Sequence, residues 1–129
     1  MTRRLGSGGP YEKRFGYSRA VVAGGHLWVS GCTSVVDGEL QGAGDAQAQA
    51  RVAIANALAA VVQAGFARED VVRTRMFVVD VPAHAETVMA VHGDVFADVL
   101  PASTLVGVTA LVDPRMLCEV EVEAYRERE

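Results

Sequence analysis

Apolar residues recur at every second position in several stretches of the chain, which is the pattern of half-buried strands. This alternation, together with an excess of β-branched residues, predicts strands at residues 18–22, 26–30, 71–79, 104–111 and 117–125. Gly24 and Gly25 separate the first two segments by a two-residue turn, so these segments are predicted to form a β-hairpin. In the third segment, one face is predicted to hold Val72, Thr74, Met76 and Val78, and the other Arg73, Arg75 and Phe77.

Spacings of three and four residues between apolar positions predict two helices. Asp45 is a suitable N-cap for the first helix, and Gly65 is a suitable residue at its C-terminal end. The second helix is predicted over residues 83–99. The order ββαβαββ then predicts an α+β two-layer sandwich, in which one mostly antiparallel sheet carries both helices on one face.

One domain spanning residues 1–129 is expected from the length of the chain. Residues 5–16 are rich in Gly, Pro and charge, so residues 1–15 are predicted to form a loose N-terminal arm. The sheet face away from the helices would carry Arg73, Arg75 and several glutamates, and it needs a cover. A subunit interface with polar clefts would fit this face.

The composition describes a core of small side chains. Val and Ala account for 22 and 20 of the 129 residues, while aromatic residues account for only 6%. Such side chains bury little area each, and a domain of this size buries only about two-thirds of its unfolded surface. The composition therefore favours stabilisation by self-association, and the 50% hydrophobic content excludes a disordered chain.

Charge and cysteine content narrow the class of protein further. The formal net charge of −4 lacks the basic excess that general nucleic-acid binding requires. No apolar run approaches the roughly 18 residues of a membrane span, and no apolar segment follows Arg3 and Arg4 as in a signal peptide. Cys32 and Cys118 are expected to be free, buried thiols in a reducing cytoplasm, and a disulfide between them is the alternative.

The last predicted strand carries the most suggestive cluster of side chains. Glu119, Glu121 and Glu123 alternate with small apolar residues, so all three carboxylates are predicted to lie on one face. One interpretation is a solvated sheet face. The other is that one carboxylate lies at an interface and holds or activates water. Tyr17 and Ser30, on adjacent strands of the predicted hairpin, could orient a small polar substrate or simply bond to the backbone.

Other kinds of site find little support. His26, His84 and His92 lack metal-ligand spacing, so no metal is expected. The glycine-rich segment at residues 42–44 lacks a phosphate-binding pattern, and there is no nucleophile-elbow motif. Cys32 could be a nucleophile, but a lone cysteine after a strand is more often a packing residue.

Short motifs from about Gly16 to Tyr125 resemble, in order and register, those of the RidA (YjgF-like, endoribonuclease L-PSP-like) family. They are Gly16–Val21, Leu27–Gly31, Gln49–Asn56, Ala64–Gly65, Asp70–Thr74 with Phe77 and Asp80, Pro101–Ala102, and Glu121–Ala124. The resemblance implies a chorismate-mutase-like fold and a homotrimer with a small-molecule cleft between neighbouring subunits. It also implies hydrolysis of reactive enamines and imines, such as 2-aminoacrylate, to ketoacids and ammonia without a cofactor.

The resemblance assigns roles to individual residues. Glu121 matches the glutamate that positions the attacking water, Tyr17 the tyrosine of the cleft, and Ser30 the serine of the S-G-Q motif. Three substrate-binding positions depart from the family pattern. Ser103 stands where the P-A-R-S/T motif has its carboxylate-binding arginine, Cys32 replaces the glutamine of S-G-Q, and Met89 stands where the second helix often carries an asparagine.

The absence of the arginine affects binding most, because a guanidinium forms a bidentate, charge-assisted clamp on a carboxylate. Ser103 offers one hydroxyl and no charge, and Glu121 would repel an anionic substrate. The chain therefore resembles an arginine-less branch of the family, and Arg19 and Arg75 are the candidates to replace the lost group.

Three functions follow from these observations. The first is hydrolysis of an imine, an enamine or a related small molecule that needs no carboxylate clamp. The second is non-catalytic binding of a metabolite or a regulatory partner in the same cleft. The third, endoribonuclease activity or inhibition of translation, follows from descriptions of some family members, but the acidic balance and low aromatic content give it little support.

Overall fold

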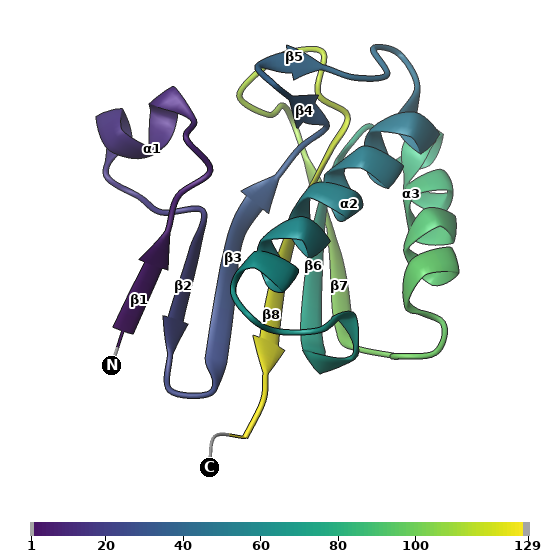
Figure 1. Cartoon of the computed structure of the whole chain (residues 1–129). Helices are drawn as coiled ribbons and strands as arrows, with labels where there is room; N and C mark the ends of the chain where they lie inside the picture. Colours follow the sequence, from purple (N-terminus) through teal and green to yellow (C-terminus); the bar gives the residue numbers. More distant parts are fainter. Residues whose placement is uncertain (1, 128–129) are drawn as a thin grey trace.

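A computed structural model describes residues 2–127, which form one six-stranded sheet with two long helices on one face (Figure 1). The strands are β1 (Thr2–Leu5), β2 (Ala20–Ala23), β3 (His26–Cys32), β6 (Val71–Val79), β7 (Ala102–Val108) and β8 (Cys118–Tyr125), with a separate hairpin of β4 (Val35–Val36) and β5 (Glu39–Leu40). The helices are α1 (Pro10–Phe15), α2 (Ala46–Gln63) and α3 (Val81–Phe96), and a single 3₁₀ turn spans Arg68–Asp70.

The main sheet has the strand order β1-β2-β3-β8-β6-β7. All neighbouring strands are antiparallel except β6 and β7, which are parallel. Helix α3 connects these two strands, as a parallel pair requires a crossover. The predicted α+β architecture with two helices on one face of a mostly antiparallel sheet is therefore confirmed, and β1 and β7 are its edges.

Small side chains bring α2 close to the sheet. Asp45 caps this helix by accepting a hydrogen bond from the backbone N–H of Ala48 at 3.1 Å. The alanines that face the sheet are fully buried, and Ile54 is 1% exposed. Ala50, Ala53 and Ala57 form this alanine stripe. The core is therefore closely packed in spite of its low aromatic content.

Strand β6 differs from the predicted alternation at one position. Thr74, Met76 and Val78 are buried against the helices as expected, but Val72 is 45% exposed. The pairing of β6 with β8 shifts register between Val71 and Arg73, which is a bulge that turns Val72 outward. An irregularity of this kind leaves no periodic signal in the sequence.

The N-terminal segment is also more ordered than the prediction of a loose arm. Strand β1 pairs with β2, and α1 follows it. The buried carboxylate of Glu12 accepts hydrogen bonds from the backbone and hydroxyl groups of Ser7, and Arg3 donates to the carbonyl of Ala64 at 2.9 Å. These contacts join single polar residues and follow no sequence pattern. A prediction from the glycine-rich composition therefore could not include them.

Two further expectations concern the cysteines and membrane spans. Cys32 and Cys118 are free and buried, so the prediction of unpaired thiols is confirmed. Between residues 2 and 127, none of the helices combines the length and apolar character needed to cross a bilayer.

Candidate functional site

Strand β8 separates a buried face from a charged one. Its inward positions are at most 1% exposed and are Cys118, Val120, Val122 and Ala124. Glu119, Glu121 and Glu123 lie on the opposite face and are partly exposed, as the alternation predicts. Helices α2 and α3 cover one face of the sheet (Figure 1). The three glutamates alternate with the residues buried against these helices, so they lie on the other face.

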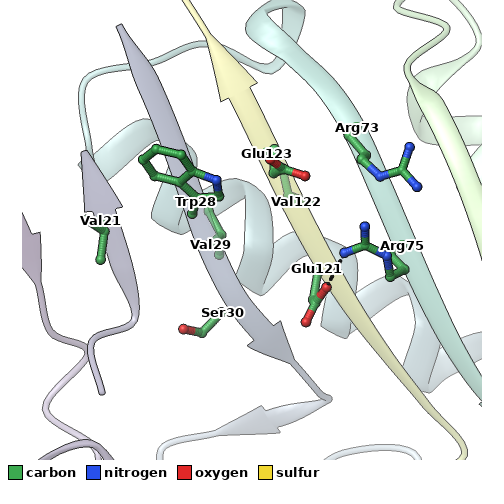
Figure 2. A pocket seen from close by; sticks show the side chains of 9 residues that line it. All are labelled: Val21, Trp28, Val29, Ser30, Arg73, Arg75, Glu121, Val122 and Glu123. Atoms are coloured by element: carbon green, nitrogen blue, oxygen red, sulfur yellow. Dashed lines mark hydrogen bonds and ion pairs between the residues drawn. The ribbon is translucent and has the colours of Figure 1, made fainter. Parts of the chain in front are cut away.

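This open face contains a hollow of about 370 Å³, which spans β2, β3, β8 and β6 (Figure 2). Polar groups and apolar surface both contribute to its lining, as is common in small-molecule sites. The lining residues are Val21, Trp28, Val29, Ser30, Arg73, Arg75, Glu121, Val122 and Glu123.

The charged groups of the hollow are paired across neighbouring strands. Arg75 Nη1 lies 2.8 Å from Glu121 Oε1, and Figure 2 shows this contact crossing from β6 to β8. Arg73, opposite Glu123 in the strand register, donates to Thr104 Oγ1 at 3.2 Å. Two arginines and two glutamates line the hollow, so their formal charges cancel.

Two stacked aromatic side chains lie beside Glu123, and one of them, Trp28, lines the hollow. The rings of His26 and Trp28 are stacked with centroids 4.3 Å apart and an interplanar angle of 7°. His26 Nε2 lies 3.4 Å from Glu123 Oε1. Trp28 itself is 42% exposed, so it offers a flat apolar surface to a ligand.

Ser30 and Tyr17 lie at the opposite end of the same face. Ser30 lines the first hollow and also a shallower one of about 500 Å³, which Tyr17 lines as well. Ser30 Oγ donates to the carbonyl of Ser18 at 2.7 Å, so this hydroxyl also ties two backbone segments together. Tyr17 is 42% exposed. Ser30 therefore connects the region of Tyr17 to that of Glu121.

Arg19 and Cys32, two of the predicted site residues, line neither hollow. Arg19 Nη1 donates to the carbonyls of Ser30 and Gly31 at 3.0 and 2.7 Å and lies 3.3 Å from Cys32 Sγ. Cys32 is 5% exposed in the core, and burial raises the pKa of its thiol. A thiol with a raised pKa is a weak nucleophile at neutral pH, so packing explains Cys32 better than chemistry.

Glu119 lies against β3 next to these residues. A Cβ atom at Gly31 would be 1.8 Å from Glu119 Oε2, so a larger residue at this position would displace the carboxylate. Burial, followed by the nearby charge of Glu121, raises the pKa of Glu119. Glu121 and Glu119 therefore share a face but have different surroundings, since Arg75 contacts only Glu121.

Ser103 and Met89 lie on the helix side of the sheet and not in the hollow. Ser103 Oγ accepts a hydrogen bond from Thr74 Oγ1 at 2.8 Å, and Thr74 is buried on the face that packs against the helices. Met89 is 48% exposed on α3. Within one chain, the sheet therefore separates Ser103 and Met89 from the group of Tyr17, Ser30 and Glu121.

The chain matches a known protein family over most of its length. The model of the family described as Endoribonuclease L-PSP matches residues 11–126. The chain belongs to this family. An uncharacterised protein of Streptomyces coelicolor is 42% identical over 127 residues, which cover 96% of this chain and 92% of that protein.

Solved structures agree with this membership in the L-PSP family. Rv2704 of Mycobacterium tuberculosis, a member of the YjgF/YER057c/UK114 family, has a TM-score of 0.87 and 37% identity, covering 98% of this chain and 100% of that one. The YjgF gene product of E. coli has a TM-score of 0.79 and 31% identity, covering 96% and 94%. E. coli TdcF with bound serine has a TM-score of 0.78 and 29% identity, covering 97% and 94%.

Two residues of this L-PSP family member were not predicted as neighbours of a site residue. Thr74 and His92 contact each other through Oγ1 and Nε2 at 2.7 Å, next to Ser103. The sequence contained a signal for Thr74, because it is a polar residue among the apolar positions of β6 that alternate toward the buried face. His92 also lies three residues after Met89 and thus on the same side of α3. Within residues 2–127, no group of three or more His, Cys, Asp and Glu side chains is arranged to hold a metal ion.

Proposed function

We propose that the hollow around Glu121 binds a small imine or enamine and hydrolyses it to a carbonyl compound and ammonia. The contact between Arg75 and Glu121 carries this proposal. It supplies a basic group next to the carboxylate, where an unpaired carboxylate would repel an acidic substrate. Arg75 therefore replaces part of the positive charge that Ser103 does not provide.

Glu121 is suited to hold the attacking water. Arg75 occupies Oε1, and no hydrogen bond to Oε2 is found within residues 2–127, so Oε2 can accept one from water. The water oxygen then bonds to the imine carbon while Glu121 takes one proton from the water, and the electrons of the carbon–nitrogen double bond move to the nitrogen, which takes up a proton to give a carbinolamine. The carbon–nitrogen bond of the carbinolamine then breaks as its hydroxyl group loses the second proton. The nitrogen receives this proton and leaves as ammonia, and a carbonyl group remains.

A second copy of the chain would complete the site. Tyr17, Ser30 and Glu121 lie on the open face, whereas Ser103 and Met89 lie at the edge formed by β7 and α3. If this edge of one copy packs over the open face of the next, both groups enter one cleft. We propose that three copies do so in a closed ring, because head-to-tail contacts of this kind form rings or filaments.

Ammonia release from imines generated in situ tests the chemistry. An amino-acid oxidase or an amine oxidase would supply acidic and neutral imines, and the uncatalysed rate would be subtracted. We expect Glu121→Gln and Tyr17→Phe to remove the enzyme-dependent release. Glu69→Gln removes a similar charge from an exposed residue outside the hollow and should leave the release unchanged. The enzyme proposal fails if no imine shows release that depends on Glu121.

Light scattering and sedimentation test the assembly. The expected result is one species with three times the mass of the chain. A stable monomer would contradict the shared cleft, because Ser103 and Glu121 could then not act on one ligand.

Non-catalytic binding is the second candidate function. TdcF, whose fold the chain shares, was crystallised with bound serine, which is a small polar metabolite. Saturable binding of a small molecule in the hollow, without any turnover that Glu121→Gln removes, would favour this function over hydrolysis.

A further inference from the structure

The shallower hollow of about 500 Å³ has a different charge from the hollow around Glu121. Arg4 of β1 and Lys13 of α1 line it, together with one acidic residue of the described chain, Glu12. Neither Arg4 nor Lys13 makes an ion pair or a side-chain hydrogen bond within residues 2–127. This hollow therefore holds two cations without partners, whereas the four charged side chains around Glu121 cancel one another.

The carboxylate of Glu12 does not neutralise these two cations, because it is engaged elsewhere. It is buried and accepts hydrogen bonds from the backbone N–H and the hydroxyl group of Ser7. Its Oε2 lies 3.8 Å from Arg19 Nε, which supplies a compensating charge. The region of this hollow therefore keeps an excess of positive charge, although the whole chain carries a net charge of −4.

Two hydroxyl groups and an apolar surface lie next to the cations. Tyr17 and Ser18 line the same hollow, and within residues 2–127 neither side-chain hydroxyl has a hydrogen-bonding partner. Arg4 lies directly opposite Val21, and Val21 lies opposite Trp28, so their side chains form one row across β1, β2 and β3. Cations and hydroxyl donors beside an apolar surface suit a ligand that joins an oxyanion to a short apolar chain.

The two hollows adjoin, because Val21 and Ser30 line both of them. In the sheet, β1 lies three strand spacings from β8, or about 14 Å, and the long side chain of Arg4 covers part of this distance. A ligand whose reacting carbon lies at Glu121 therefore reaches the cations only through several intervening atoms.

We propose that Arg4 and Lys13 bind an oxyanion, a carboxylate or a phosphate ester, at the far end of the substrate. The substrate is then an imine or enamine whose acidic group is separated from the reacting carbon by a short apolar chain, which lies over Val21 and Trp28. This inference rests on the hydrolysis proposed above, because it names the class of substrate for that site. It places the acidic group at the β1 side of the sheet and not beside the reacting carbon.

Hexanoate and hexanamide form a matched pair of probes, because they have nearly the same shape and differ in charge. Trp28 is the single tryptophan of the chain and lines the hollow around Glu121, so its fluorescence reports whether the apolar chain reaches this hollow. Each probe is titrated against the assembled wild-type protein by calorimetry and by fluorescence. We expect hexanoate to bind roughly ten-fold more tightly, to change the fluorescence of Trp28, and to lose this advantage as salt is added.

Adjacent residues of α1 supply the matched control. Lys13→Gln and Arg4→Gln should each lower the preference for hexanoate by about three-fold, since each removes one exposed charge contact. Arg14→Gln changes the net charge equally, but Arg14 lies over the ring of Phe15 and lines neither hollow. This control variant should leave the preference unchanged. Equal effects of Lys13→Gln and Arg14→Gln would indicate a general attraction of anions to the N-terminal segment and would refute a site.

Hexyl phosphate, titrated in the same way, distinguishes the two oxyanions. Tighter binding than that of hexanoate identifies a phosphate ester as the acidic group, and weaker binding identifies a carboxylate. Both orders support the inference, provided that Lys13→Gln weakens the binding and Arg14→Gln does not.

Ammonia release connects the site to the substrate. An amine oxidase converts 6-aminohexanoate and hexylamine into imines that differ only in the distal group, which is a carboxylate in the first and a methyl group in the second. Lys13→Gln should raise the KM for the acidic imine and leave that for the neutral imine unchanged. Equal KM changes for both imines would contradict the assignment of the oxyanion to the substrate.

Three binding results would overturn the inference. They are equal binding of hexanoate and hexanamide, no binding of hexanoate, or binding of hexanoate that leaves the fluorescence of Trp28 unchanged. None of these probes contains an imine, so the binding result is independent of ammonia release. A preference for hexanoate that depends on Lys13, without hydrolysis of any imine, would support the oxyanion site and refute the hydrolase. Hydrolysis without this preference would do the opposite.

Discussion

The two faces of β8 share one backbone but have opposite environments. The buried face packs Val120 and Val122 against α2, and these side chains are at most 1% exposed. The other face presents Glu119, Glu121 and Glu123, which remain partly exposed. Glu121 pairs with Arg75 on β6, and Glu123 lies 3.4 Å from His26 on β3. A period of two is therefore enough to separate the residues that stabilise the fold from those that could carry chemistry.

This difference teaches where substitutions should have their effects. Burial of apolar side chains supplies most of the free energy of folding, whereas an exposed ion pair contributes about 0–1 kcal/mol. The open face can therefore change its charges at little cost in stability. The buried face cannot accept a charge or an unpaired polar group at little cost. Thr74 is a polar residue on this face, and its hydroxyl has two hydrogen-bonding partners.

The largest expected effect lies on the buried side. Phe96 is 1% exposed, and its ring lies 4.7 Å from that of His92. Phe96→Ala should lower the free energy of unfolding by about 3–5 kcal/mol, because it removes buried surface and leaves a cavity. Denaturant titration at fixed protein concentration measures this change. A loss of less than about 1 kcal/mol would show that the helix layer is not packed as described.

The open face should respond much less in stability and much more in activity. Arg75→Gln removes one partner of an ion pair in which both side chains are more than a third exposed. The expected loss in free energy of unfolding is at most about 1 kcal/mol and should shrink as salt is added. Imine hydrolysis, in contrast, should fall, with the largest loss for acidic imines.

A larger loss from Arg75→Gln would also be informative. Several kcal/mol, independent of salt, is the cost of leaving a buried charge without its partner. That result would mean that the cleft between the copies shields Glu121 from water. The same substitution therefore measures both the surface character of the pair and its burial in the assembly.

The sequence was sufficient for the elements but not for every contact. Alternation and helical spacing predicted β6, β8 and α2 closely, because each has one clearly buried face. The bulge that exposes Val72 could not be predicted, because one extra residue in a strand leaves the residue types of the segment unchanged. The ordered N-terminal segment was missed because single polar contacts, such as those of Glu12, hold it.

The site shows the same limit. Period two was enough to place Glu121 on the open face, but its pairing with Arg75 depends on the register between β8 and β6. The hydrogen bonds of Thr74 with Ser103 and His92 depend in addition on the parallel pairing of β6 with β7 and on the position of α3. A linear pattern contains no information on register between distant segments, so these contacts required the folded structure.

The smallest expected effect is a pH dependence on the helix side. Burial lowers the pKa of His92 below its ordinary value of 6.5, so the unfolded chain binds this proton at a higher pH than the folded one. Just below pH 6.5 the unfolded state therefore holds more protons, and stability should fall as the pH decreases toward the lower folded pKa.

His92→Gln removes this titration. The free energy of unfolding of the variant should therefore fall less between pH 7.5 and about 5.5 than that of the wild type. Glu119, whose pKa is raised, acts with the opposite sign but is present in both proteins and cancels in the difference. Equal slopes would show that His92 has the same proton affinity in the folded and unfolded states and would contradict the prediction.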